Sequence, residues 1–222
     1  MSNRTESLYK AGAHVGYSKS RRHPSVRPFL FGMKHRSDII NLEQTSQQID
    51  TAIAALKAVV VTGKKVALAG TKPEIKRLIT DLAKETNMPY ATKRWVGGTL
   101  TNIGQIRARV DLLDDLISKK ESGNLVYRTK KELLLIDRKI DKLELNFGGL
   151  RGMKELPAML LVVDPKKEVN AIAEARQRHI PIVAIASTDC DVSIIDYPIV
   201  ANDTNVESVG YILSELQKGL MV

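Results

Sequence analysis

The chain has 222 residues and is poor in the side chains that crosslink proteins or bind metal ions. Its single cysteine, Cys190, excludes an intramolecular disulfide and any zinc ribbon built from paired cysteines. Three of its four histidines fall within the first 40 residues, and no cysteine lies near them in sequence. We therefore expect neither a metal ion nor another cofactor. The histidines are His14, His23, His35 and His179.

Aromatic residues and long apolar runs are also scarce. With three Phe, one Trp and six Tyr, the core has to be built mainly from Ile, Leu, Val and Ala. The apolar runs are short and interrupted, which excludes a membrane-spanning helix. The first ten residues have no apolar stretch that could serve as a signal peptide. We expect a soluble protein of the cytoplasm, without a membrane partner.

No familiar catalytic or nucleotide-binding motif is present. Gly70-Thr71-Lys72 follows an expected strand, but it lacks the upstream glycine and the GK[ST] order of a phosphate-binding loop, and no GxGxxG occurs. Cys190 lies between two aspartates, whose charges raise a thiol pKa and weaken the nucleophile. We therefore expect no enzyme and no small-molecule substrate. A nucleotide-dependent enzyme on an α/β scaffold and a free-standing protein-binding scaffold stay as alternatives.

A group of carboxylates follows the ends of expected strands near the C-terminus. Ligands bind at this edge in α/β proteins, and four carboxylates could hold a Mg²⁺ ion. Aspartate also caps turns and helix starts, and we favour that role here. The four residues are Asp189, Asp191, Asp196 and Asp203.

The net charge of +9 is unevenly distributed along the chain. Residues 1–40 hold eight Lys and Arg against two Asp and Glu, and residues 41–149 hold nineteen against thirteen, whereas residues 150–222 are net acidic. A protein this basic usually binds a polyanion, most often nucleic acid. Residues 14–36 are rich in Pro and Gly and show no apolar periodicity, so we expect this segment to be poorly ordered until phosphates hold it. In the middle segment a simple solvated face is an equal alternative.

Strand-like and helix-like segments alternate over most of the chain. This alternation predicts an α/β fold, a doubly wound sheet of about five parallel strands. The expected strands cover residues 38–41, 65–69, 90–92, 159–164, 180–186 and 197–200, and the expected helices residues 51–61, 75–82, 169–175 and 206–220.

A different pattern interrupts this alternation. Residues 103–117 and 133–147 repeat apolar side chains in steps of three and four, flanked by charges, which is typical of coiled-coil helices. A polar break between them predicts an antiparallel helical hairpin, and two crossover helices lying on the sheet are the alternative. Glycine pairs at 97–98 and 148–149 mark its ends. We therefore predict a basic N-terminal arm (1–37), an α/β domain (38–100 and 150–222) and an inserted hairpin (101–149).

Several motifs resemble a known family in the same order along the chain. The most specific is the nine-residue run RWVGGTLTN at residues 94–102. It is accompanied by the segments 11–16, 28–32, 39–45, 142–144, 148–150, 156–157, 162–164, 180–181, 188–191 and 202–203. Together they resemble the bacterial-type small ribosomal subunit protein two family from about residue 7 to residue 215. The chain departs from the family pattern at Arg22-His23-Pro24-Ser25, Ala158 and Val192.

The resemblance implies both a fold and a function. It implies a flavodoxin-like α/β domain with an inserted coiled-coil hairpin. It also implies a structural, non-enzymatic protein that binds small-subunit rRNA between head and body, beside neighbouring ribosomal proteins, with docking of ribosomal protein one in bacteria. We expect no homo-oligomer, and a place on the cytoplasmic ribosome, with an organellar ribosome left open.

Phosphate neutralisation by Lys and Arg would supply most of the affinity for rRNA. The expected RNA contacts are Arg21, Arg22, His23, Lys34, His35, Arg36, Lys93 and Arg94, with Thr99 and Asn102 as polar contacts to phosphate or sugar. Trp95 has two possible roles: it stacks on a base, or it packs at the root of the hairpin. We favour the packing role.

Overall fold

The computed structural model describes residues 3–122 and 130–221. Its centre is a five-stranded sheet in which every neighbouring pair is parallel. The strands lie in the order β5 (Tyr90–Ala91), β4 (Val66–Ala69), β6 (Met159–Val163), β7 (Ile182–Ala186) and β8 (Tyr197–Val200). Along the chain this order is 2-1-3-4-5, the flavodoxin-like arrangement. The predicted α/β class is confirmed.

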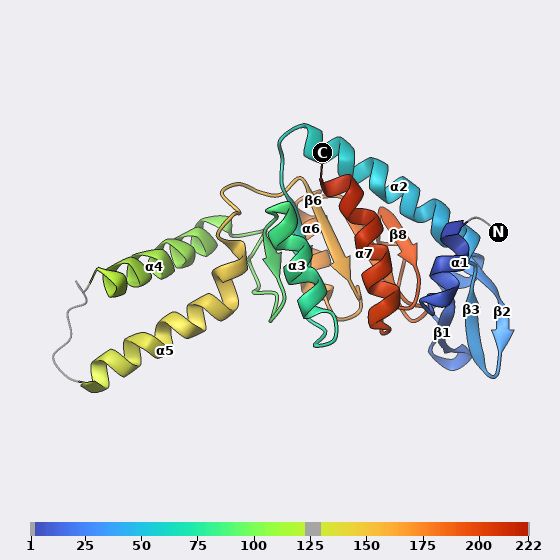
Figure 1. The fold of residues 1–222 in the computed structure, drawn as a ribbon, viewed down its shortest axis with the longest axis horizontal. Helices are drawn as coiled ribbons and strands as arrows, with labels where there is room; N and C mark the ends of the chain where they lie inside the picture. The colour runs from blue at the N-terminus through green and yellow to red at the C-terminus, as the bar shows by residue number, and fades with distance from the viewer. Residues whose placement is uncertain (1–2, 123–129, 222) are drawn as a thin grey trace.

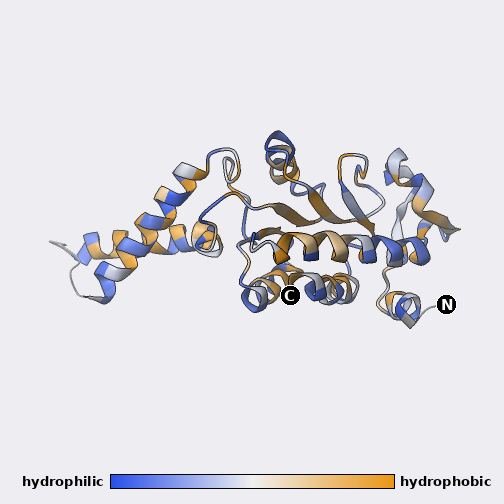
Figure 2. Ribbon diagram, turned by 90° about the horizontal axis from the view of Figure 1, so that it is seen from above, coloured by the Kyte–Doolittle hydropathy of each residue, from blue (hydrophilic) through white to orange (hydrophobic). Residues whose placement is uncertain are grey.

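Helices cover both faces of this sheet (Figure 1). One face packs against α2 (Leu42–Val61), α3 (Lys76–Thr86) and α7 (Val206–Leu220), and the other packs against α6 (Val169–Gln177). Successive strand residues belong alternately to the two cores, as period-2 geometry requires. Strands β4, β6 and β7 are therefore buried on both sides, which explains their unbroken apolar sequences. Figure 2 shows these apolar strands between helices that carry both hydrophobic and hydrophilic residues.

Capping residues set the helix ends. The side chain of Asn41 accepts hydrogen bonds from the first backbone N–H groups of α2, which begins well before the predicted residue 51. The side chain of Asn205 accepts from Glu207 N at the start of α7. Asn87 ends α3 in the left-handed conformation, with φ of +53°. The predicted bounds of the last helix, 206–220, agree with α7.

The N-terminal segment is folded against the α/β domain. It contains α1 (Asn3–Lys10), two 3₁₀ turns (Lys19–Arg21 and Pro24–Phe29) and an antiparallel sheet of β1 (Val15–Ser18), β3 (Ser37–Ile40) and β2 (Leu30–Lys34), in that order. The strand predicted at 38–41 therefore belongs to this sheet and not to the parallel one. The sequence predicted poor order for residues 14–36, but the structure has this segment folded, with Val26 fully buried in the core on the α6 side.

Two helices, α4 (Ile103–Glu121) and α5 (Lys130–Phe147), project from the β5 side of the sheet (Figure 1). The sequence predicted a polar break over residues 118–129, but α4 continues through residues 118–121. The rest of that break, from residue 123 to 129, lies outside the described residues. At the root of the pair, Ile106 and Val110 form a small core with Leu150 and Met153. The coiled-coil packing and the domain boundaries stay predictions.

None of the helices in residues 3–122 and 130–221 combines the length and the apolar composition that a membrane span requires.

Candidate nucleic-acid interface

The run RWVGGTLTN forms a loop between the edge strand β5 and helix α4, and this loop is built around one carboxylate. Glu174, on α6, is buried. Its Oε1 accepts from Trp95 Nε1 at 3.1 Å and from Gly98 N at 2.9 Å. Trp95 itself is buried in the core on the α6 side. Trp95 is therefore a packing residue, as favoured, but it packs in the core on the α6 side and not in the small core at the root of the hairpin.

The second oxygen of Glu174 binds the far end of the same loop. Oε2 accepts from Leu100 N at 2.8 Å, from Thr101 N at 3.1 Å and from Thr101 Oγ1 at 3.2 Å. Burial raises the pKa of Glu174, but the hydrogen bonds from the loop outweigh burial and hold the pKa below its usual value. Gly98 has φ of +90°, which only glycine adopts readily. The loop formed by this motif thus encloses the Glu174 carboxylate, an anion supplied by the same chain.

The loop presents some of the predicted contacts and hides one. Lys93 and Arg94 are exposed, and Asn102 is exposed at the first turn of α4. Within residues 3–122 and 130–221 neither Lys93 nor Arg94 has an ion-pair partner. Thr99 is buried, and its hydroxyl donates to Val96 O at 2.5 Å. In this conformation Thr99 does not reach the surface.

Lys93 and Arg94 line a groove beside β5. Its volume is about 450 Å³, and its other walls come from the start of α3 and the end of α5. Lys76, at the first position of α3, adds a third cation to the groove, and Asn146 adds an amide. The sequence analysis missed Lys76, because nothing in its local pattern shows that α3 begins beside β5. Glu144 also lines the groove, and its Oε2 lies 2.9 Å from Arg151 Nη2.

The cations of the N-terminal segment divide into two kinds. Lys34, His35 and Arg36 are exposed at the turn between β2 and β3. His35 and Arg36 have φ of +49° and +68°, which is the geometry of a tight hairpin turn. This turn presents three basic side chains to solvent.

Arg22, in contrast, forms a hydrogen-bonded ion pair with Asp38 inside the protein. Its Nε lies 2.7 Å from Asp38 Oδ2, and its Nη2 donates to Asp38 Oδ1. Asp38 is completely buried, so the guanidinium compensates a carboxylate that water cannot reach. Arg22, which the sequence predicted as an RNA contact, is therefore held in an ion pair within the N-terminal segment.

Arg21 and His23 lie against the loop that follows β7. The Arg21 guanidinium stacks 4.2 Å from the Tyr17 ring centre, and its Nη2 is 3.5 Å from Asp189. His23 Nδ1 is 2.8 Å from Ser25 Oγ and 3.8 Å from Asp191. Both side chains remain partly exposed. The predicted contacts thus form two groups, one in the N-terminal segment with β1–β3 and one beside β5, where α4 and α5 project, so that the two groups lie on opposite sides of the parallel sheet (Figure 1).

The four predicted aspartates do not gather into one site. Asp189 pairs with Lys166 at 2.8 Å, Asp191 caps a turn by accepting from Ser193 N at 3.0 Å, and Asp196 accepts from Ile182 N at 2.8 Å. Only Asp191 has the capping role that the sequence favoured.

Asp203 belongs to a buried group at the carboxyl edge of the sheet. Lys72 Nζ lies 2.8 Å from Asp164 and 3.1 Å from Asp203. Burial raises the pKa of Asp203 to about 6, although the Lys72 charge acts in the opposite direction. Burial likewise raises the pKa of the neighbouring Cys190 to about 12, which makes it a poor nucleophile, as the sequence indicated.

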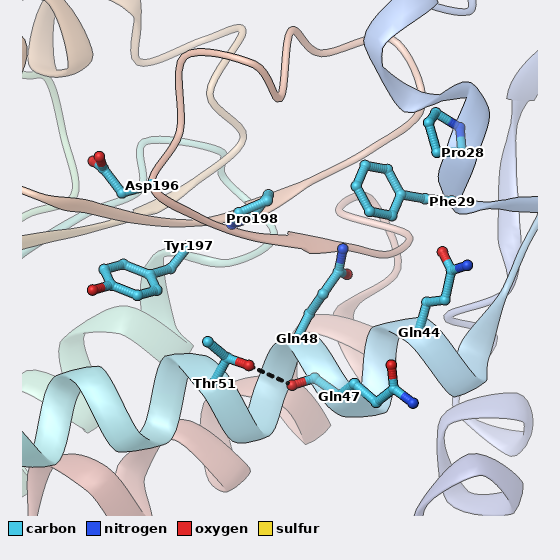
Figure 3. Close-up of a pocket in the computed structure, with 9 residues that line it drawn as sticks. All are labelled: Pro28, Phe29, Gln44, Gln47, Gln48, Thr51, Asp196, Tyr197 and Pro198. Carbon is cyan, nitrogen blue, oxygen red and sulfur yellow. Dashed lines mark hydrogen bonds between the residues drawn. The ribbon is translucent and has the colours of Figure 1, made fainter.

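Another hollow, of about 390 Å³, lies between the 24–29 turn, α2 and β8 (Figure 3). Three glutamines of α2 and the rings of Phe29 and Tyr197 line it, with Asp196 as its charged residue. None of the predicted RNA contacts lies in this hollow.

A flavodoxin-like parallel sheet, with exposed cations beside β5 and at the turn between β2 and β3, defines a basic α/β protein. The model of the ribosomal protein S2 family matches residues 8–221. The chain is 40% identical to small ribosomal subunit protein uS2 of Karelsulcia muelleri, over 97% of both chains. It is 39% identical to the uS2 of Petrotoga mobilis, over 96% of this chain and 74% of the relative, and 40% identical to that of Mycobacteroides abscessus, over 90% and 73%.

The chain therefore belongs to the ribosomal protein S2 family. It is a structural, non-enzymatic protein associated with the small ribosomal subunit.

Proposed function

We propose that the chain binds small-subunit rRNA through the groove beside β5 and the turn between β2 and β3. Lys93 and Arg94 carry the argument: both are exposed, neither has an ion-pair partner among the described residues, and a tightly hydrogen-bonded loop follows them. Cations in such a position neutralise phosphates at little cost in conformational entropy. Two cationic surfaces on opposite sides of the parallel sheet suit a protein that bridges two parts of an rRNA fold, such as the head and the body of the small subunit.

The salt dependence of binding tests this proposal. Each phosphate contact contributes about 0.9 to the slope of log affinity against log salt for duplexes and about 0.7 for single strands. Replacing Lys93 and Arg94 by Gln should lower the slope by about 1.4 to 1.8 and weaken binding to small-subunit rRNA. The matched control replaces Lys57 and Lys84, exposed on α2 and α3, by Gln. An equal loss of slope in both variants would show that the groove has no special role.

Docking of ribosomal protein one is the second function we propose, and an apolar surface supports it. Phe31 of β2 is 81% exposed, and Tyr9 and Met33 are also exposed. Beside them is a mainly apolar hollow of about 290 Å³ between α1 and the antiparallel sheet. Exposed apolar patches of this kind mark protein-binding sites. Phe31→Ser, which adds no charge beside the turn between β2 and β3, should abolish binding of protein one and leave rRNA binding intact. Unchanged binding of protein one would contradict this assignment.

A further inference from the structure

The loop from Trp95 to Thr101 surrounds a carboxylate with five donors. Three are backbone N–H groups, one is the Trp95 indole and one is the Thr101 hydroxyl, at 2.8 to 3.2 Å from Glu174. Both carboxylate oxygens are used, two donors on Oε1 and three on Oε2. A concave set of backbone N–H groups is the arrangement that proteins use to bind phosphate and other anions. Here the anion is Glu174, supplied by α6 of the same chain.

The loop that Glu174 binds lies between the two cations and the start of α4. Lys93 and Arg94 precede the loop directly, and α4 begins just after it, at Ile103. By binding both ends of the loop, the carboxylate fixes the direction in which the two cations leave β5 and the direction in which α4 starts. A second hydrogen bond joins α6 to the loop: Arg178 Nη2, at the end of α6, donates to Thr101 O.

We propose that Glu174 is a positioning residue for rRNA binding: it occupies the loop's anion site from within, and so presets the groove of Lys93 and Arg94 before RNA arrives. This inference rests on the proposed function of the groove. An alternative role is purely structural, in which the carboxylate stabilises the α6-side core and has no effect on the cations. The two roles differ in whether the effect of Glu174 on affinity depends on Lys93 and Arg94.

The test combines Glu174→Gln with the variant in which Lys93 and Arg94 are Gln. The amide of Glu174→Gln keeps the size of the side chain, but its NH₂ group opposes the N–H donors of the loop. In the wild-type background we expect at least a tenfold loss of affinity for small-subunit rRNA and a smaller salt slope. In the background without Lys93 and Arg94 we expect less than a twofold further loss, because the two cations that the loop positions are no longer present. Equal losses in both backgrounds would overturn the proposal, as would unchanged affinity of Glu174→Gln.

Fluorescence of Trp95, the single tryptophan of the chain, reports on the loop independently. Glu174→Gln should make Trp95 more accessible to acrylamide, and the matched control Glu168→Gln should not. Glu168 is also buried, but its Oε1 accepts from Thr71 N, away from the loop. If Trp95 stays equally protected in Glu174→Gln, the carboxylate does not hold the loop and the proposal fails.

A third variant tests the proposal without relying on Glu174→Gln. Glu174→Ala leaves the anion site open, and added formate should restore Trp95 protection and rRNA affinity, whereas chloride at equal ionic strength should not. If Glu174→Gln does not fold, this rescue decides the proposal: restoration by formate supports it, and equal behaviour in the two salts overturns it. If the wild-type chain binds no rRNA, the proposed function fails, and the Trp95 readout still shows whether Glu174 holds the loop.

Discussion

The pairing of Arg22 with Asp38 predicts that the N-terminal segment contributes strongly to stability. Replacing Arg22 by Met removes the guanidinium but keeps much of the side-chain length. Asp38, completely buried on β3, is then left without its charge partner. Breaking a buried pair on one side costs about 3–5 kcal/mol. Since the Arg22 side chain is 18% exposed, we expect the lower end, about 3 kcal/mol.

Urea denaturation at pH 7 measures this loss as a change in the free energy of unfolding. The neighbouring Arg21→Met is the control: Arg21 is more than half exposed, so its contacts with Tyr17 and Asp189 should contribute about 1 kcal/mol or less. Arg22→Met combined with Asp38→Leu should recover most of the loss, because no unpaired charge remains. A loss below about 1 kcal/mol for Arg22→Met would refute the reasoning and return Arg22 to the set of free RNA contacts.

Three further outcomes follow from buried groups. Val110→Asp places a carboxylate in the small core at the root of α4, at a cost of about 3 kcal/mol. Circular dichroism should show loss of helix while the main unfolding transition of the α/β domain is retained. A single unfolding transition shared by the whole protein would contradict this. Asp203, with a pKa of about 6 instead of 3.8, favours its protonated form in the fold. Stability should therefore fall by about 2 kcal/mol as the pH rises from 4 to 7, because each unit of pKa difference is worth about 1.4 kcal/mol and part of the difference acts below pH 4. Asp203→Asn should abolish this fall, and parallel pH curves for the two proteins would disprove it. Cys190, buried and with its pKa raised to about 12, should resist thiol reagents at pH 8 until urea unfolds the chain; rapid labelling of the folded protein would count against this.

The parallel sheet could be predicted because its signals are local. Strands β6 and β7 are buried on both faces, so each is a continuous apolar run that needs no knowledge of its neighbours. The capping asparagine at residue 205 and the apolar spacing after it similarly define α7. The two helices beyond β5 could be predicted because their apolar side chains repeat in steps of three and four residues.

The N-terminal segment could not be predicted in this way. β2 has mainly exposed residues, including Phe31, so its burial follows no alternating pattern. Val26 is buried by packing against elements distant in sequence, and a single apolar residue among Pro and Arg gives no periodic signal. Asp38 was visible as an acidic residue in a basic segment, but only the fold shows that it pairs with Arg22.

In the candidate interface, the exposed cations were easier to predict than the residues that hold them. Lys93 and Arg94 were identified from charge and from the motif. Thr99 was misplaced, because a polar residue in a loop is usually exposed and this one is turned inward. Glu174 was missed, although one signal was present: it stands on the buried side of α6 with Ala171 and Ala175, where an acidic residue needs a specific set of donors.

Sedimentation of a cell extract tests the central claim, that the chain works as part of the small ribosomal subunit through its cations. At moderate salt, tagged wild-type protein should migrate with small subunits and leave little in the free fractions. The variant with Glu at positions 93 and 94 should shift toward the free pool, while the control with Glu at positions 57 and 84 stays bound. Wild-type protein found only in the free fractions, or equal binding of all three proteins, would contradict the account.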